Sequence, residues 1–290
     1  ELMASLLEAL PDDAAVILIG DVDQLPSVGP GQVVHDLIES GAVHVVGLTE
    51  NRRQAENSSI IRNAYRVNRG MVPVCSDDPN DDFQWIIDSD LQRVGDRVIQ
   101  LVAHELPRRF GLDPRHDIQA LSPMRRGELG TFALSRRLQR ELVPNPPAKL
   151  VIGDAHYGVG DRLLQLTNYN DLGVFNGDTG QLVAINDVDK TFQVDFDGLL
   201  ITYDFDQMDD LALANPMTVH KAQGSEYPAA VIAFASAHYP LLSKRLLYTA
   251  MTRARRVFLV GDEQAVQIAL NNQRNELRRT GLQQRLRLAM

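Results

Sequence analysis

The sequence is poor in cysteine, in aromatic residues and in long apolar runs. Cys75 is the one cysteine among 290 residues, which excludes an intrachain disulfide and a cysteine-rich zinc site and favours a reducing cytoplasm. No apolar run approaches the roughly 18 residues that a membrane span needs. The first ten residues, ELMASLLEAL, have the spacing of an amphipathic helix and lack the basic start of a signal peptide. We therefore expect a cytoplasmic protein with no membrane partner.

Basic residues are also in short supply, since the formal net charge is -9. The deficit is local. Residues 151–210 hold twelve aspartates and two basic residues, Arg162 and Lys190, whereas the rest of the chain holds 27 basic and 26 acidic residues. The steering of a charged ligand depends on local potential more than on net charge. The negative net charge therefore does not exclude a nucleic-acid partner.

Short β-branched apolar runs separated by helical patterns make up most of the chain. The runs predict strands buried on both faces at residues 15–20, 43–48, 118–123, 229–234 and 256–261. Apolar spacing near 3.6 predicts helices at residues 58–70, 97–111 and 130–142. This alternation predicts a parallel α/β sheet, in which ligands bind at the carboxyl ends of the strands. The predicted ends carry polar turns at Gly20-Asp21, Ser122–Gly127 and Gly261-Asp262.

Residues 151–210 follow a different pattern. Apolar and polar residues alternate within 163–167, 181–186, 191–196 and 199–205, and Asp197-Gly198 is a hairpin turn signal. This pattern predicts a small antiparallel barrel inserted into the α/β domain, whose own pattern resumes at about residue 211. Residues 263–290, rich in Arg and Gln, predict a solvated terminal helix.

The string GDVDQLPSVGPG at 20–31 runs from a predicted strand end into a loop restricted by Pro26 and Pro30 and freed at Gly29 and Gly31. Gly-Asp alone would be an ordinary turn. The full string resembles motif III of superfamily-one helicases in its RecD form. The resemblance implies that Asp21 and Gln24 respond to the γ-phosphate of ATP and that the loop at Ser27 and Val28 contacts DNA.

The string MTVHKAQGSEYP at 217–228 crowds polar side chains between two apolar segments. Each residue alone would fit the solvated start of a helix. As a whole the string resembles motif V of the same helicases. The resemblance implies DNA contacts for one set of residues and nucleotide contacts for another: Thr218, His220, Lys221 and Gln223 toward DNA, and Gly224 and Glu226 toward the nucleotide.

Two arginine-bearing strings resemble further helicase motifs. LLYTAMTRARRVFLVG at 246–261 resembles motif VI, which implies that Arg253 is an arginine finger. A guanidinium on the γ-phosphate neutralises transition-state charge, an effect worth about 10³ to 10⁵ in rate. LTENRRQ at 48–54 resembles motif IV and implies a second phosphate-contacting arginine, Arg53. The family usually has an aromatic or apolar residue at the position of Arg52, so packing or adenine contact differs there.

Two shorter strings complete the resemblance. SPMRRGELGT at 122–131 resembles a strand-end loop that meets DNA phosphates through Pro123, Arg125 and Arg126. VFNGDTGQLV at 174–183 resembles the start of the SH3-like barrel of RecD-type helicases and places Asn176 near DNA. The resemblance covers nearly the whole chain.

The resemblance implies an α/β fold. We expect a RecA-like parallel-sheet helicase motor domain with an inserted small SH3-like β-barrel, preceded by the last part of a first RecA-like domain. The expected boundaries are 1–47 for the remnant of the first domain, 48–150 and 211–290 for the two parts of the second domain, and 151–210 for the barrel.

The implied activity is that of an ATP- and Mg²⁺-dependent 5′→3′ DNA helicase in recombination and double-strand break repair. Its partners would be single-stranded DNA, DNA ends and possible RecB- and RecC-like subunits. Gln24, Arg53 and Arg253 would be the catalytic residues. The sequence lacks G-x-x-x-x-G-K-[ST], the usual phosphate-binding loop, so we expect this chain alone to be inactive and to bind no cofactor tightly.

Other classes stay open. The chain could be a non-catalytic DNA-binding or scaffold module of a recombination nuclease complex. A nuclease is a further class, although no convincing carboxylate-lysine cluster is present. The acidic insert should repel phosphate except near Asn176, Gly177 and Thr179, or its charge serves only solubility.

Overall fold

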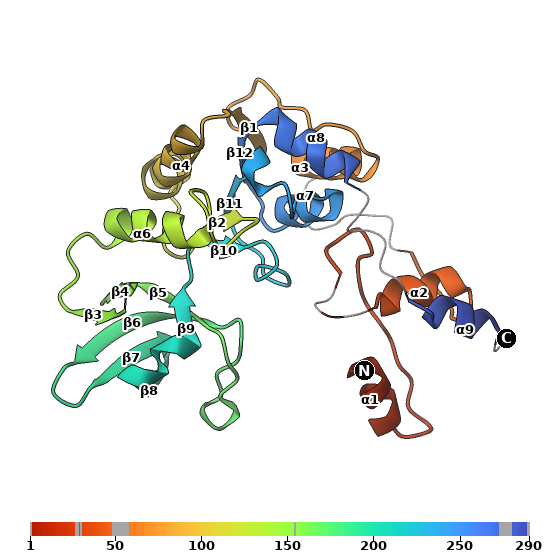
Figure 1. The fold of residues 1–290 in the computed structure, drawn as a ribbon, viewed down its shortest axis with the longest axis horizontal. Helices are drawn as coiled ribbons and strands as arrows, with labels where there is room; N and C mark the ends of the chain where they lie inside the picture. The colour runs from red at the N-terminus through yellow and green to blue at the C-terminus, as the bar shows by residue number, and fades with distance from the viewer. Residues whose placement is uncertain are drawn as a thin grey trace.

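The computed structural model of the chain describes residues 2–26, 29, 31–47, 58–153, 155–272 and 280–288. Two sheets dominate it, a parallel sheet flanked by helices and an antiparallel sheet at one end of it (Figure 1). No helix in these ranges is both long and apolar enough to cross a membrane.

The parallel sheet has five strands in the order β1-β12-β11-β2-β10. Their bounds are Phe83–Ile87, Val257–Gly261, Ala229–Ala233, Ile118–Ser122 and Met217–Thr218. All four pairings are parallel. Every residue of β2, β11 and β12 is buried, which confirms the prediction of strands buried on both faces at 118–123, 229–234 and 256–261.

Helices cover both faces of this sheet (Figure 1). One face packs on α4 (Leu91–Gln100) and α6 (Thr131–Leu142), and the other on α3 (Ser59–Asn68), α7 (Lys244–Met251) and α8 (Glu263–Asn271). Successive side chains of β11 point to opposite faces of the sheet and so belong to two separate cores. Val231 faces the first helix layer, and Ala230 and Ile232 face the second. The helices predicted at 58–70 and 130–142 are confirmed. The one at 97–111 forms as α4, a π-helical turn at Leu101–Glu105 and α5 (Leu106–Phe110).

The antiparallel sheet has the order β8-β7-β6-β5-β9 and lies beside a two-stranded ribbon, β3-β4. Their bounds are Leu199–Asp204, Thr191–Phe196, Thr179–Asn186, Arg162–Gln165 and Leu211–Leu213, with Lys149–Ile152 and Ala155–Gly158 in the ribbon. Asp197 and Gly198 both have positive φ, 52° and 94°, as the predicted hairpin turn requires. Its core includes stacked rings of Phe192 and Tyr203, 5.2 Å apart.

A buried amide joins the two sheets. After β9 the chain returns to the parallel sheet, where β10 pairs with β2. Before β10 begins, the Asn215 side chain takes the place of a strand: its Oδ1 accepts from Ala120 N at 2.9 Å and its Nδ2 donates to Ile118 O at 2.9 Å. Gln119 Nε2 also donates to Ala214 O at 3.0 Å. The insert is therefore attached at the amino edge of β2.

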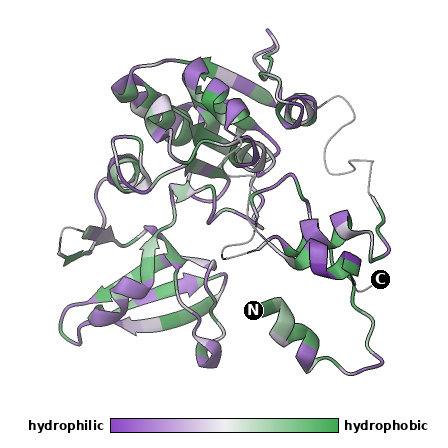
Figure 2. Cartoon of the chain, turned by 45° about the vertical axis from the view of Figure 1, so that its right-hand side comes forward, coloured by the Kyte–Doolittle hydropathy of each residue, from purple (hydrophilic) through white to green (hydrophobic). Residues whose placement is uncertain are grey.

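The predicted strands at 15–20 and 43–48 are wrong for the described residues. Residues 15–20 and 43–47 belong to no strand, and Ile17 and Ile19 are 84% and 90% exposed. These apolar segments lie between or beside α1 (Leu2–Ala9) and α2 (Val33–Ser40), and Figure 2 shows green stretches along them. A buried strand needs neighbours to pair its backbone groups, and no described residue supplies them here.

The predicted terminal helix over 263–290 is also wrong as one element. Helix α8 ends at Asn271, Thr280 and Gly281 are not helical, and α9 spans Leu282–Leu288. α9 lies against α2, where Thr280 Oγ1 donates to Asp36 Oδ2 at 2.6 Å and Gln283 Nε2 donates to Glu39 O at 3.2 Å. The segment thus packs on the N-terminal part of the chain, with no α9 residue buried.

Candidate functional site

The carboxyl edge of β2 and β10 carries one group of candidate residues. Thr218 pairs with Ser122 in parallel register, so the two predicted DNA-contacting strings lie side by side. Ser122 Oγ donates to Leu129 O at 2.7 Å and closes the loop between β2 and α6. Within that loop Pro123 is buried, whereas Arg125 and Arg126 are exposed.

This loop passes close to itself at Gly130. A Cβ at Gly130 would lie 2.4 Å from Arg126 O, so a side chain is excluded where α6 begins. The close turn brings Arg125 over the ring of Phe132, with the guanidinium carbon 5.1 Å from the ring centroid. The Phe132 N–H donates to Arg125 O at 3.1 Å, which fixes the two residues together.

Lys221 and His220 belong to the same edge. Burial, and to a smaller extent the like charge of Arg125, lowers the pKa of Lys221. The positive charges of Lys221 and Arg125 therefore repel each other. Partial burial also lowers the pKa of His220, and this favours its neutral form. The edge thus holds clustered positive charge from Arg125 and Lys221 despite the net charge of the chain.

A short segment links this edge to a second cluster. Residues 219–226 run from the carboxyl end of β10 to the amino end of β11, because Thr218 pairs with Ser122 and Ala229 with Ile118. Gly224 has φ of 86°, a left-handed conformation that favours glycine in this turn. Gln223 Nε2 then donates to Leu25 O at 2.7 Å.

Arg253 is the centre of the second cluster. Its side chain contacts residues from three of the strings that resemble helicase motifs, and the residue is only 4% exposed. Nε donates to Thr249 O at 3.2 Å, Nη1 to Ser225 O at 3.4 Å and Nη2 to Gln24 Oε1 at 3.0 Å. The predicted arginine finger and the predicted glutamine therefore touch.

The loop that holds Gln24 is docked on α7. Gln24 Nε2 donates to Asp21 Oδ2 at 3.0 Å, and Tyr248 OH donates to the same oxygen at 3.1 Å. Leu25 N donates to Thr249 Oγ1 at 2.8 Å. Burial and the Asp21 carboxylate raise the pKa of Tyr248, which keeps its hydroxyl protonated as the donor.

Other candidates lie elsewhere or outside the described residues. Asn176 lies in the loop between β5 and β6 of the antiparallel sheet, where its N–H donates to Asn168 Oδ1 at 2.8 Å. Glu226 forms an ion pair of 3.6 Å with Arg255. Three candidates, Ser27, Val28 and Arg53, lie outside the described residues, as does Arg52.

Sequence reasoning gave no role to Tyr248 and Thr249, although both lie in the quoted motif VI string. Their helical spacing from Thr252 and Arg253 was the available signal, because residues three and four apart share a helix face. In contrast, the strand-end turn at Asp262 is structural: Oδ1 accepts from Ala265 N at 2.6 Å and Oδ2 from Ser236 N at 2.8 Å. Arg256 likewise packs 4.2 Å over the Phe110 ring.

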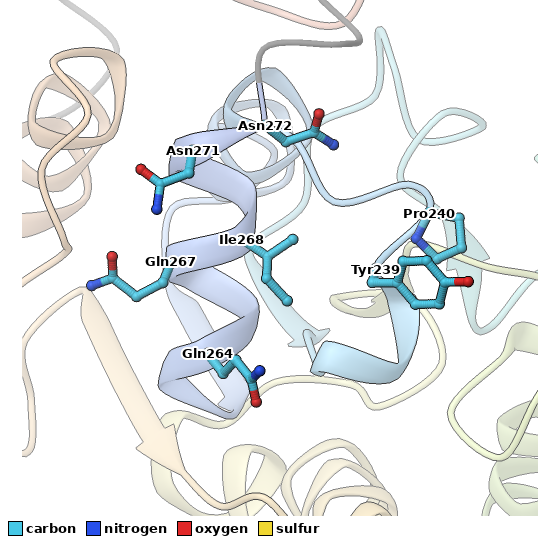
Figure 3. Close-up of a pocket in the computed structure, with 7 residues that line it drawn as sticks. All are labelled: Tyr239, Pro240, Gln264, Gln267, Ile268, Asn271 and Asn272. Carbon is cyan, nitrogen blue, oxygen red and sulfur yellow. The ribbon is translucent and has the colours of Figure 1, made fainter.

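A separate open hollow of about 530 Å³ lies between α8 and the turn after β11 (Figure 3). Its lining is uncharged: Tyr239, Pro240, Gln264, Gln267, Ile268, Asn271 and Asn272. Within the ranges that the structure describes, no group of three or more His, Cys, Asp or Glu side chains is placed to hold a metal ion.

Three family models match the chain: an AAA domain over residues 1–90, the SH3 domain of ATP-dependent RecD-like DNA helicases over 134–196, and a UvrD-like helicase C-terminal domain over 214–260. A Pif1 helicase from Bacteroides, solved with ADP-AlF3 and ssDNA, has a similar fold. Its TM-score is 0.51 at 17% identity, over 88% of this chain and 63% of that one. The fold and site thus define a RecA-like helicase motor domain carrying an SH3-like insert.

Curated relatives narrow the class. The ATP-dependent RecD2 DNA helicase of Deinococcus radiodurans is 36% identical over 99% of this chain. The RecBCD enzyme subunit RecD of Mycolicibacterium smegmatis is 30% identical over 99% of it. The chain belongs to the RecD-type DNA helicases. It spans 38% of the length of the first relative and 52% of the second.

Proposed function

We propose that the intact protein is an ATP-driven 5′→3′ DNA helicase that acts in recombination and double-strand break repair in the cytoplasm. The observation that carries the proposal is the contact of Gln24, Ser225 and Arg253, because it joins strings resembling motifs III, V and VI at one guanidinium. We further propose the boundaries 1–47, 48–150, 151–210 and 211–290 for the parts of the two motor domains and the barrel.

The Arg253 cluster fits one side of a nucleotide site. Its guanidinium is oriented by Thr249, Ser225 and Gln24. A planar guanidinium matches the geometry of a phosphate, which would offer it charged acceptors. The residues proposed to hold ATP are Asp21, Gln24, Arg53, Gly224, Glu226 and Arg253, with Gln24, Arg53 and Arg253 in the catalytic roles. ATP with Mg²⁺ would supply the free energy of translocation.

The carboxyl-edge group supports single-stranded DNA as a partner. Arg125 and Arg126 are exposed on the loop after β2, and Lys221 follows Thr218 on the neighbouring loop. The edge therefore offers charge and hydroxyl donors to phosphates. The proposed DNA contacts are Ser27, Val28, Pro123, Arg125, Arg126, Asn176, Thr218, His220, Lys221 and Gln223. DNA ends and RecB- and RecC-like subunits are further proposed partners, since some relatives are named as RecBCD subunits.

Salt dependence of binding tests the DNA proposal. The affinity of the 290-residue chain for an oligothymidine is measured across a salt series for the unchanged chain and for R125A, K221A and R108A. Arg108 is the matched control, because it is exposed on α5 near the opposite edge of β2. We expect R125A and K221A each to weaken binding and to reduce the slope of log K against log salt by about 1, and R108A to leave both unchanged. Equal effects of all three would contradict the assignment.

The alternative is a non-catalytic DNA-binding or scaffold module, which a full-length protein without a phosphate loop would favour. We expect residues 1–290 to show no DNA-stimulated ATP hydrolysis, since nothing in the sequence matches G-x-x-x-x-G-K-[ST]. Robust hydrolysis by this chain would contradict both the expected inactivity and the scaffold alternative. Hydrolysis by a longer form of the protein that is lost on R253A would favour the helicase.

A further inference from the structure

Phe132 is an aromatic side chain that the fold leaves half in solvent. It is the second residue of α6 and is 51% exposed, at the carboxyl edge of β2. α6 has a well-buried apolar face formed by Leu134 and Leu138, so Phe132 is not needed for that packing. An exposed ring at a charged edge is a candidate contact surface.

The surroundings of Phe132 set it apart from other exposed rings. Tyr65, Phe175 and Tyr239 are 53%, 49% and 66% exposed. Of these four, Phe132 is the ring that a guanidinium covers in the described structure, with Arg125 at 5.1 Å. Tyr239 instead borders the uncharged hollow of Figure 3, which has no charged side chain to meet a phosphate.

The pair of Phe132 and Arg125 offers two planar groups beside a phosphate-binding edge. Bases of single-stranded nucleic acids stack on aromatic rings and on guanidinium planes, whereas their phosphates bond cations. Lys221 donates its N–H to Thr218, which pairs with Ser122 at the start of the loop that holds Arg125, so both cations belong to one edge. Stacking on a ring needs no particular base, since every base has a π face.

We propose that one nucleobase of single-stranded DNA stacks on the platform formed by Phe132 and Arg125 while adjacent phosphates meet Lys221 and Thr218. This inference rests on the proposed function and assigns a base contact to an edge previously given only backbone contacts. The contact tolerates any sequence, as a translocating protein requires.

The test compares F132A, F132W and the matched control Y239A with the unchanged chain, using a fluorescein-labelled oligothymidine. We expect F132A to weaken binding about fivefold or more, with the salt slope unchanged, because a stacking contact is lost and no phosphate contact is. F132W should restore binding and Y239A should leave it unchanged. Circular dichroism and melting curves establish that each variant is folded.

A second measurement needs no variant. A 2-aminopurine base within the oligonucleotide should lose fluorescence when the unchanged chain binds, because stacking quenches it. Normal binding by F132A, or equal losses in F132A and Y239A, would overturn the platform and leave the proposed function standing. Absence of salt-dependent binding by the unchanged chain would overturn the proposed function and the platform with it.

Discussion

At the scale of single residues, Arg253 combines charge with nearly complete burial. Its side chain donates to the Thr249 and Ser225 carbonyls, to the Thr252 hydroxyl and to the Gln24 amide oxygen. Several hydrogen bonds to one buried guanidinium hold it in a fixed orientation. The same residue therefore ties the loop at 21–25 to α7 and to the segment before β11.

Removing this side chain should loosen the loop as well as the site. We expect R253A to lower the free energy of unfolding by about 1–3 kcal/mol, because Gln24 and two carbonyls lose a charged partner. The control is R255A, whose 75%-exposed side chain forms a surface ion pair worth about 0–1 kcal/mol at most. Urea denaturation of both variants checks this, and equal stabilities would contradict the structural role of Arg253.

His238 gives the fold a defined dependence on pH. Burial lowers its pKa to about 4, and Ala235 N donates to its Nδ1 at 3.2 Å, a bond that requires an unprotonated nitrogen. The unfolded pKa is about 6.5. Protons therefore bind the unfolded chain preferentially between these values, and the contribution of His238 is complete above about 6.5 and is lost as pH falls toward 4.

The loss is measured as a difference between two proteins. The unchanged chain should lose up to about 3 kcal/mol of stability between pH 7.5 and 4.5 that H238N does not lose. Denaturant midpoints at several pH values give this difference and cancel the other titrating groups. Parallel profiles for the two proteins would assign the acid sensitivity elsewhere.

At the scale of elements, β10 is a short strand extended by a side chain. Two residues of β10 pair with β2, and the Asn215 amide bonds Ile118 and Ala120 further along the same edge. An amide carries a donor and an acceptor in the spacing of a peptide group. Asn215 thereby satisfies backbone groups that would otherwise be buried without partners.

Removing the Asn215 amide should lower the stability of the fold by more than the small size of the side chain suggests. We expect N215A to destabilise the chain by about 2–4 kcal/mol, because a buried N–H and a buried carbonyl lose their partners together. N170A is the matched control, since Asn170 is an exposed amide of the insert. Thermal melting measures both, and a change in N215A no larger than in N170A would show that water replaces the amide.

The elements differ in how far the sequence predicts them. β11 and β12 are continuous apolar runs, so their composition predicts burial on both faces. β2 is apolar except for Gln119 and Ser122, and it is also buried throughout. β1 was missed, because Gln84 and Trp85 interrupt the apolar pattern of an edge strand. The run at 15–20 has the same composition as a buried strand, yet pairing depends on neighbours that composition does not encode.

In the candidate site, too, local strings were predictable from the sequence and contacts between distant residues were not. The strings around Gln24, Thr218 and Arg253 were predicted from their residues, and the structure brings Gln24 to Arg253. The docking of Asp21 on Tyr248 joins residues 227 positions apart, which no local pattern predicts. Phe132 was overlooked because a helix-start phenylalanine is read as core until its exposure is known.

At the scale of the whole molecule, charge is segregated between the sheets. The acidic insert is attached at the amino edge of β2, and the exposed cations Arg125, Arg126 and Lys221 lie at the carboxyl edge. Several aspartates are used internally, such as Asp161, which accepts from Gly158 N at 2.7 Å, and Asp210, which accepts from Tyr169 OH at 2.5 Å. The exposed aspartates determine the electrostatic potential around the insert.

Neutralising exposed aspartates of the insert should change DNA affinity. We expect joint replacement of four exposed aspartates, Asp171, Asp187, Asp197 and Asp206, by asparagine to tighten single-strand binding severalfold in low salt. The gain should vanish in high salt, since screening removes long-range repulsion between exposed charges. Binding titrations at two salt concentrations decide this. Unchanged low-salt affinity would assign the acidity to solubility alone.

The attachment of the insert also bears on how the protein can change during evolution. The chain leaves α6 and returns through Ala214 and Asn215 at one corner of the parallel sheet, so both ends of the insert meet the same neighbourhood. A cassette joined in this way is lengthened, exchanged or deleted without rerouting any strand of its host. The order of strands in the parallel sheet therefore does not depend on the length of the insert.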